Sequence, residues 1–439
     1  MKESRYNYFA EDEGKVICLN GVSGNVLDIS TDAYRELKHI LSSPEKANVD
    51  KELSQSLYEL GFLIDDDFDE IEFLRKRYHS TIQKGYYHLT VNPTLECNFR
   101  CWYCYESHNK GHMTPQTLES LKKLVEKTIK RDDIKIFELG WFGGEPLLYF
   151  DEVMYPLAKY THTIASDNGK GYFSSMTSNG YYLTKDVIKK CQEIKLNSIQ
   201  ITLDGNRELH NKTRNNNGLP SFDVIINNII DYCKYDRSNH ITLRINYTDE
   251  VIKTDFKKVF ELFPEDIRSQ IRVNFQRVWQ TIGVEKSTDS LIDNVGYIEK
   301  MGFMLSHNAS FALYRGRVCY ADSINYANVN YDGSIYRCTA NEYKKQDRLG
   351  YLDENGEIVW ERKELIDKVM STPTFENEMC LKCKNLAICG GLCFNRRMNY
   401  LLTGKLSCVK SKLDTGGVSE YLKEYYKIRL EKRRKLNME

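Results

Sequence analysis

The sequence predicts an α/β fold. Its centre is a partial (β/α)6 TIM barrel, with an N-terminal winged-helix-like module before it and a cysteine-rich segment after it. Two observations predict this arrangement. Six short apolar runs alternate with amphipathic stretches between about residues 86 and 280, a pattern typical of a parallel sheet with connecting helices. Ten of the 13 cysteines form two groups, one near position 100 and one between 319 and 408.

Size and composition set the first limits. The 439 residues are too many for one core and indicate two or three domains. Lys+Arg and Asp+Glu both total 62, so a formal net charge of zero argues against nucleic acid or an anionic membrane as partner. The sequence contains no apolar stretch of membrane-spanning length and no apolar signal segment near its start. We therefore expect a cytoplasmic protein, in which clustered cysteines point to metal rather than disulfides.

Residues 1–80 predict a small separate module. Residues 15–21 and 24–29 are apolar runs joined by turn residues, which indicates a hairpin. Helical patterns follow from Thr31 through Ile40 and over residues 47–60. The acidic run 65–70 is either a linker or the solvated start of a helix.

Residues 86–310 predict the barrel. Helices are expected between the strands over 118–129, 187–194 and 222–232, and the strands are expected at 87–91, 136–142, 172–175, 198–203, 241–247 and 271–278. In barrels of this kind the chemistry lies at the carboxyl ends of the strands. Four notable segments directly follow expected strands, namely residues 97–104, 143–146, 178–180 and 204–205.

Residues 311–415 predict a loop-rich domain that metal has to organise, because the short strands at 326–330 and 335–337 offer little apolar core. The basic run 421–436 predicts a C-terminal helix within residues 416–439.

The first cysteine group is the triplet Cys97, Cys101 and Cys104, spaced CxxxCxxC after a strand. Three thiolates can hold a cubane iron–sulfur cluster and leave one iron open for chemistry. A zinc site is the alternative, with His108 or His112 as the only nearby further ligands, although zinc sites favour a second ligand pair. The triplet, with Tyr103 before its last cysteine, resembles the signature of the radical S-adenosylmethionine (SAM) enzymes.

This resemblance implies that the open iron binds the amino and carboxylate groups of SAM. Gly144, in a Gly-Gly-Glu-Pro segment like that of the family, would contact the cofactor, and Tyr103 would lie against its adenine. Thr202 matches a hydroxyl that meets the ribose, and Arg214 an arginine that holds the carboxylate. The glycines also fit an ordinary turn, and Thr202 and Arg214 fit structural roles equally well.

The second cysteine group resembles the SPASM extension, which holds two auxiliary [4Fe–4S] clusters; a zinc ribbon at residues 380–393 is the alternative. The resemblance assigns Cys319, Cys338 and Cys393 to the first auxiliary cluster and Cys380, Cys383, Cys389 and Cys408 to the second. The first set is one ligand short. Either an open iron binds substrate or a protein oxygen such as that of Asp322 closes the site. Thr339 stands where sulfatase maturases of this family have an aspartate.

The resulting prediction is a radical SAM enzyme with three [4Fe–4S] clusters, resembling maturases of ribosomally made peptides and, more distantly, anaerobic sulfatase maturases. It would take hydrogen from a precursor peptide bound by the N-terminal module, and form a thioether or carbon–carbon crosslink. A one-electron reductant such as flavodoxin or ferredoxin would supply the electron. The alternatives are a maturase of a cysteine or serine side chain in a folded protein, and a non-catalytic metal-binding scaffold. We assign no catalytic side chain.

Overall fold

The computed structural model describes residues 1–12, 14–42, 51–81, 85–281, 294, 297–298, 300–305 and 319–408. The chain forms two compact units. The first, here called the module unit, contains Met1–Ile82, Ala309–Asp322 and Lys368–Glu439; the second, the barrel unit, contains Gln83–Asn308 and Ser323–Asp367. The domain boundaries expected from the sequence (1–80, 86–310, 311–415 and 416–439) stay predictions. The expected C-terminal helix lies outside the described residues.

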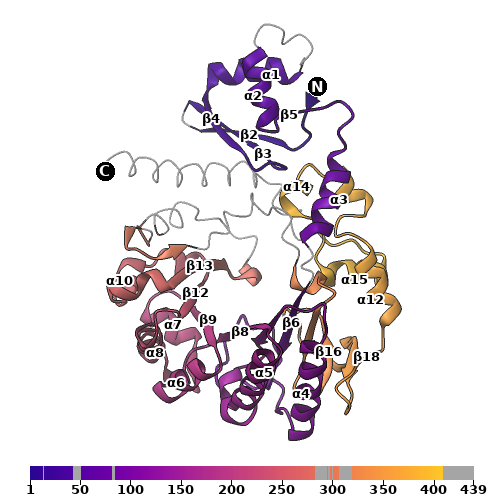
Figure 1. The fold of residues 1–439 in the computed structure, drawn as a ribbon. Coiled ribbons are helices and arrows are strands. Elements are labelled where there is room, and N and C mark those ends of the chain that lie inside the picture. The colour runs from indigo at the N-terminus through magenta and orange to yellow at the C-terminus, as the bar shows by residue number, and fades with distance from the viewer. Residues whose placement is uncertain are drawn as a thin grey trace. The chain divides into compact units, whose positions relative to one another are not determined.

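An open sheet of eleven strands forms the centre of the barrel unit (Figure 1). Across the sheet the strands are β14 (Met304–Leu305), β13 (Ile271–Arg277), β12 (His240–Tyr247), β9 (Leu196–Leu203), β8 (Gly171–Ser178), β7 (Ile136–Trp141), β6 (Tyr86–Val91), β15 (Tyr326–Val329), β16 (Ser334–Tyr336), β17 (Gly350–Leu352) and β18 (Ile358–Trp360).

The six expected strands are all present, and neighbours among them pair in parallel, which confirms the partial barrel. The sheet extends further than expected at both edges. β14 adds in parallel to β13, and β15 adds in parallel to β6 with Leu89 opposite Ala327. The short strands expected at 326–330 and 335–337 therefore continue the barrel sheet.

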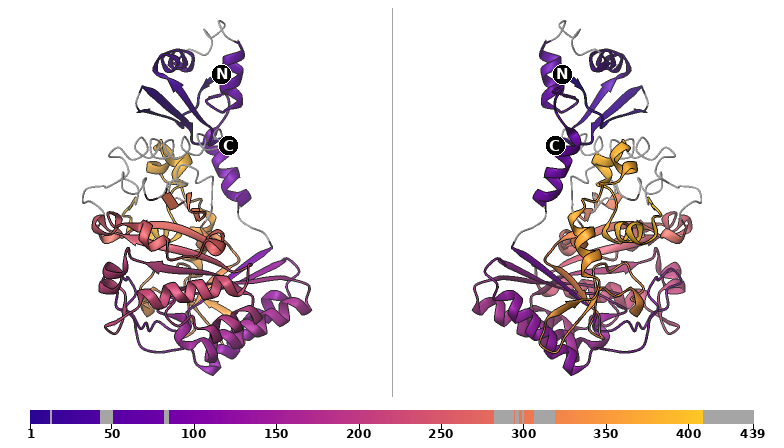
Figure 2. Two further views of the ribbon diagram at one scale, coloured as in Figure 1. Left: turned by 90° about the vertical axis from the view of Figure 1, so that its left-hand side faces the viewer. Right: turned by 90° about the vertical axis from the view of Figure 1, so that its right-hand side faces the viewer.

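Alternation along the strands gives this sheet two different faces. Leu89 on β6, Leu139 on β7 and Ile201 on β9 are fully buried on one face, while His88 and Glu138 point to the other. The apolar face packs against helices, which Figures 1 and 2 show along one side of the sheet. These helices are α4 (Pro115–Ile129), α5 (Tyr155–Asp167), α6 (Lys185–Glu193), α7 (Arg207–Thr213), α8 (Phe222–Tyr235), α9 (Asp249–Ile252) and α10 (Phe256–Phe260). The opposite face keeps polar side chains available for a site.

The N-terminal part of the module unit contains an antiparallel sheet of β2 (Asn7–Asp12), β3 (Lys15–Asn20) and β4 (Val26–Ser30). β3 and β4 are the expected hairpin, whereas β2 was not anticipated. Helices α1 (Thr31–Ser42) and α2 (Lys51–Glu59) follow, and β1 (Lys2–Glu3) pairs with β5 (Leu63–Ile64). Ser30, not Thr31, caps α1, because its hydroxyl accepts a hydrogen bond from Ala33 N–H at 3.2 Å.

The acidic run 65–70 starts a helix, α3 (Glu70–Thr81), and is not a linker. Asp69 caps it, because its carboxylate accepts hydrogen bonds from the N–H groups of Ile71 and Glu72 at 2.9 and 3.0 Å. α3 also packs on the cysteine-rich segment of the same unit, where Arg75 forms an ion pair with Glu376.

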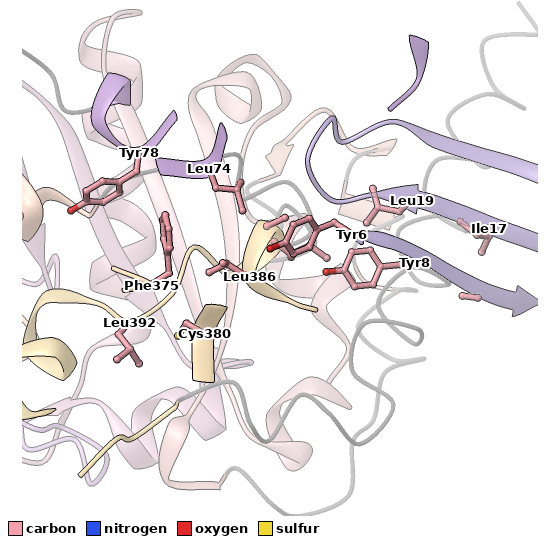
Figure 3. Packing of buried hydrophobic residues seen from close by; sticks show 13 residues of the cluster. Tyr6, Tyr8, Ile17, Leu19, Leu74, Tyr78, Phe375, Cys380, Leu386 and Leu392 are labelled. Atoms are coloured by element: carbon pink, nitrogen blue, oxygen red, sulfur yellow. The ribbon is translucent and has the colours of Figure 1, made fainter. Parts of the chain in front are cut away.

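The cysteine-rich segment contributes α12 (Lys363–Ser371), α13 (Glu378–Lys382), α14 (Leu386–Cys389) and α15 (Phe394–Thr403). Within the module unit, one hydrophobic cluster joins this segment to the N-terminal strands and α3 (Figure 3). It includes Tyr6, Tyr8 and Leu74 from the first part, and Phe375 and Leu386 from the second. The two parts are therefore one packed body. Within the described residues, no helix is long and apolar enough to cross a membrane.

Candidate active site

The cysteine triplet lies in the loop after β6, and the neighbouring strand ends contact it. Asn179, after β8, donates from Nδ2 to Asn98 Oδ1 at 2.7 Å and lies 3.9 Å from Cys97 Sγ. Arg214 Nη1 is 3.5 Å from Cys101 Sγ, and Cys104 Sγ is 3.4 Å from His108 Nε2. Burial raises the pKa of the Cys97 thiol to about 12 and that of Cys104 to about 11. Metal binding here therefore has to displace protons.

Tyr103 is fixed by charged groups at the ends of β9 and α7. Its hydroxyl donates to the Asp204 carboxylate, with distances of 2.9 and 2.7 Å to the two oxygens, and accepts from Arg214 Nη1 at 2.8 Å. Asp204 and Arg214 are both buried. Burial raises the pKa of Asp204 to about 6, against the lowering effects of Arg214 and of the Tyr103 hydrogen bond. Two of the residues proposed from the sequence, Tyr103 and Arg214, are thus in direct contact.

The Gly143–Gly144 turn after β7 is packed against the backbone of the cysteine loop. A Cβ atom added to Gly144 would lie 2.6 Å from the Leu95 carbonyl carbon and closer still to the Glu96 oxygen. Gly144 also has φ +49°, in the left-handed region. Its N–H donates to the Glu106 carboxylate at 2.6 Å. The glycine is therefore required by the fold of the loop itself, a reason independent of the cofactor contact expected from the resemblance.

Glu145, the next residue, connects two strand ends. It is fully buried, and its carboxylate accepts from the Ser178 hydroxyl at 2.8 Å and from Asn179 N–H at 2.7 Å. Burial raises its pKa, although these hydrogen bonds favour the charged form. The loops after β6, β7 and β8 are consequently held together by one polar network that passes through Asn179.

Thr202 occupies the polar face of β9, directly opposite Arg244 on β12. Thr202 is buried and Arg244 is half-buried. Arg244 Nε donates to Asn246 Oδ1 at 2.8 Å. Burial lowers the pKa of Arg244, and the nearby Tyr105 and Tyr103 raise it. The structure therefore places a second arginine, which the sequence did not single out, beside the expected ribose contact.

His210 on α7 supports both Asp204 and Arg214. Its Nδ1 accepts from Asp204 N–H at 3.3 Å, so in the neutral ring the proton is on Nε2, which lies 3.0 Å from Ser221 Oγ. Ser221 in turn donates to the Arg214 carbonyl at 2.6 Å. This chain of hydrogen bonds fixes the backbone on both sides of the Tyr103 contact.

A pH-dependent stability follows from His210. Burial, followed by the charge of Arg214, lowers its pKa well below 6.5. Below pH 6.5 the unfolded chain therefore binds a proton that the native state does not, and stability falls as the pH decreases. Below pH 6.5, His210 makes the free energy of unfolding fall by up to about 1.4 kcal/mol per pH unit, and we expect His210→Gln to remove this contribution. Urea unfolding at pH 7.5, 6.5 and 5.5 measures the difference.

Wild type and variant have to be compared at each pH, because the raised pKa of Asp204 makes stability change in the opposite direction. Equal slopes in the two proteins would show that His210 does not contribute.

The later cysteines are distributed over both units. Cys380, Cys383, Cys389 and Cys408 all belong to the module unit. Burial raises the pKa of the Cys380 thiol, and the charges of Cys389, Cys408 and Cys383 raise it further. Their role as one ligand set stays a prediction. In the other set, Cys338 belongs to the barrel unit, while Cys319 and Cys393 belong to the module unit. That set stays a prediction.

Asp322, the oxygen ligand considered from the sequence, has a protein partner. It is 1 % exposed and forms an ion pair with Arg397, which is 5 % exposed. Its backbone N–H donates to the Cys319 carbonyl at 2.8 Å. A buried pair of this kind is costly to separate. The geometry therefore favours a structural role for Asp322 over that of a metal ligand.

Residues 91–263 match the family model described as Radical SAM superfamily. This segment of the chain is a radical SAM domain. The matched segment contains the cysteine triplet, the Gly143–Gly144 turn, Asp204 and Arg214. The family implies a [4Fe–4S] cluster and SAM. The prediction of an enzyme is confirmed, and the non-catalytic scaffold is no longer the better explanation.

Two curated relatives extend this result. The chain is 22% identical over 460 residues to the radical SAM cyclopropyl synthase TigE of Paramaledivibacter caminithermalis, covering 89% of each protein. It is 25% identical over 203 residues to GTP 3′,8-cyclase of Haemophilus influenzae, covering 45% of this chain and 55% of the cyclase. The first similarity reaches well beyond the radical SAM segment, whereas the second does not.

Two solved structures share the fold. anSMEcpe with bound AdoMet and the Cp18Cys peptide matches with a TM-score of 0.56 and 20% identity, over 80% of this chain and 98% of that one. Streptococcus suis SuiB bound to precursor peptide SuiA matches with a TM-score of 0.51 and 14% identity, over 91% of this chain and 96% of SuiB. This radical SAM enzyme therefore has the fold of both proteins.

The residues around the triplet fit a cluster that binds SAM. Three thiols on one loop are a donor set for iron, and Arg214 adds a buried cation beside Cys101. Two buried donors near the triplet, Asn98 Nδ2 and Arg214 Nε, have no partner within the described residues. In the same residues, no three His, Cys, Asp or Glu side chains converge on one metal position. The thiolates of a cubane bind separate irons, so a cluster does not require such convergence.

Proposed function

We propose that this radical SAM enzyme modifies a peptide, removing two hydrogens as it forms a thioether or carbon–carbon crosslink. Three findings support the proposal. TigE is similar over 89% of the chain, and SuiB, solved with a precursor peptide, shares the fold over 91%. The observation that carries the proposal is the N-terminal sheet, in which β4 has β3 as its one strand partner among the described residues.

The site residues then have distinct tasks. Cys97, Cys101 and Cys104 would hold the cluster, which with SAM supplies a 5′-deoxyadenosyl radical. Arg214 would hold the SAM carboxylate, and Thr202 would face the ribose. Asp204 and His210 keep Tyr103 and Arg214 in place through the hydrogen bonds described above. The polar face of the sheet would receive the substrate.

The later cysteines would hold two auxiliary clusters, as expected from the sequence. Cys380, Cys383, Cys389 and Cys408 would form one complete ligand set. Cys319, Cys338 and Cys393 would form the other set, which supplies three ligands to a four-iron cluster. Because Asp322 is paired with Arg397, we propose that the fourth iron of this cluster is open to substrate. An auxiliary cluster would accept the electron released as the new bond forms. The peptide thus loses one hydrogen atom to the radical, one proton and one electron.

The alternative substrate, a side chain of a folded protein, is supported by the shared fold of anSMEcpe. The residue after Cys338 argues against it. Thr339 stands where sulfatase maturases have an aspartate, and its carbonyl accepts hydrogen bonds from the Tyr105 and Tyr343 hydroxyls, both at 3.2 Å. No carboxylate is supplied at this position, so peptide crosslinking remains the better proposal.

The edge of β4 that faces away from β3 would give the peptide a place to bind. Asn20 N–H donates to the Asn25 carbonyl, and hydrogen-bonded pairs alternate along an antiparallel ladder. The N–H of Val26, which is paired with Leu19, therefore points away from β3. An added peptide strand would hydrogen-bond there, as in other complexes formed by β-strand addition.

The test uses the small peptide encoded beside this enzyme, the reconstituted full-length protein, SAM and a reductant. We expect the peptide to lose two hydrogens by mass spectrometry. Val26→Pro, which removes an N–H directed away from β3, should bind labelled peptide about tenfold more weakly by fluorescence anisotropy. Peptides of unchanged mass would contradict the proposed reaction.

Val26→Ala is the matched control. It keeps the backbone N–H and removes only the side-chain methyl groups, which pack against the buried cluster that contains Tyr6 and Tyr8. If both variants weaken binding equally, the side chain is responsible and strand addition at β4 is wrong.

A further inference from the structure

The N-terminal strands contact the second cysteine set within the module unit. Tyr8 on β2 donates a hydrogen bond from its hydroxyl to the Lys384 carbonyl, next to Cys383. Gly21, in the β3–β4 turn, is so close to α14 that an added Cβ would lie 3.2 Å from Ile388 and 3.4 Å from Ala387. Cys380 and Tyr6 belong to the same buried cluster (Figure 3). The peptide-binding part and the cysteine loop therefore share one interface.

Tyr6 is the unexplained residue of this interface. It is fully buried, and its hydroxyl has no hydrogen-bond partner within the described residues. Its backbone is satisfied, because Tyr6 N–H donates to Ser4 Oγ at 3.2 Å and Gly21 N–H donates to the Tyr6 carbonyl at 2.8 Å. An unpaired buried hydroxyl is costly, so a folded protein rarely keeps one without a partner.

The packing around Tyr6 suggests what that partner is. Tyr6 shares its buried cluster with Cys380 and with Leu386, which lies between Cys383 and Cys389 in the sequence. Tyr8, in the same cluster, donates to the Lys384 carbonyl beside Cys383. Both tyrosines therefore lie beside the cysteine set. Burial raises the pKa of Tyr6 to about 12, so its hydroxyl keeps its proton at neutral pH and remains a donor.

We propose that Tyr6 donates a hydrogen bond to a sulfur of the iron–sulfur cluster held by Cys380, Cys383, Cys389 and Cys408. This inference rests on the proposed function, which assigns that cluster. Tyr6 would be a positioning and tuning residue, not a catalytic one. Hydrogen bonds to cluster sulfurs stabilise the reduced, more negative state and raise the reduction potential. The N-terminal module would then help to set the potential of the cluster that accepts an electron.

The experiment compares wild type with Tyr6→Phe as anaerobically reconstituted full-length proteins. The variant keeps the ring in the apolar cluster and removes only the hydroxyl. A redox titration monitored by EPR follows the signal of this cluster, which is identified as the signal that the Cys383→Ala variant lacks. We expect Tyr6→Phe to keep the iron content of wild type. Reduction of its cluster should be about three- to tenfold less favourable, and a tenfold change lowers the midpoint potential by about 59 mV for a one-electron couple. Tyr34→Phe, in the other apolar cluster of the module, should leave the potential unchanged.

Two results would overturn the inference, and they differ from each other. If Tyr6→Phe retains its iron and its midpoint equals that of wild type, Tyr6 is only a packing residue, while the cluster assignment stands. If the wild type shows no signal that Cys383→Ala removes, the auxiliary cluster itself is wrong.

Discussion

Gly144→Ala is expected to lower the free energy of unfolding by about 4 kcal/mol or more. A loss of this size is exceptional for a single substitution. The added Cβ would lie 2.6 Å from the Leu95 carbonyl carbon, with the Glu96 oxygen even closer, and both are backbone atoms that cannot rotate away. The cysteine loop would have to move to make room. We therefore expect a large fall in the urea midpoint, together with reduced iron uptake by the triplet on anaerobic reconstitution.

Gly169→Ala separates the two causes of this loss of stability, which are the close contact with backbone atoms and the left-handed backbone conformation. Gly169 also has a left-handed conformation, with φ +62°, but nothing lies within 4 Å of an added Cβ. It should show only the conformational penalty of about 1 kcal/mol. If the two variants have the same midpoint, the close approach to residues 95–96 is not what requires glycine at position 144.

The barrel could be predicted from sequence because its signals are local. In β6 from Tyr87 and in β9 from Ser198, apolar residues alternate with polar ones to the end of the strand, and each strand is followed by a recognisable turn. β15 could not be placed in the same way. Its four residues are all buried, but their pairing with β6 joins positions more than 230 residues apart. β2 was missed for a related reason, since packing within the module unit stabilises it.

The site was predicted in part. Cysteine spacing identified the triplet, and the strand-end segments identified the turn at Gly144 and the loop at Asp204. His210 gave no signal, because a histidine in a short helix has no distinctive pattern, and only the fold brings it to Asp204 and Ser221. The sequence shows that Asp322 is near Cys319 but does not show its buried pairing with Arg397.

Replacing all three triplet cysteines with alanine is expected to have the largest effect on chemistry. Without these thiolates no cluster can present an open iron to SAM, so 5′-deoxyadenosine formation should become undetectable by chromatography. The later cysteines are untouched and lie on other elements. The iron content should therefore fall by only about a third, from about twelve to about eight per chain.

The complementary variant, with Cys380 and Cys383 replaced by alanine, makes this result specific. It should lose about four irons and keep SAM cleavage, because its changes lie in the module unit and the triplet lies in the barrel unit. A wild type that binds only about four irons would contradict the auxiliary clusters and leave the radical SAM site intact. Residual cleavage by the triple-alanine protein would instead mean that another cysteine set serves SAM. In that case the hydrogen bond between Tyr103 and the buried Arg214 would have to be reinterpreted as structural.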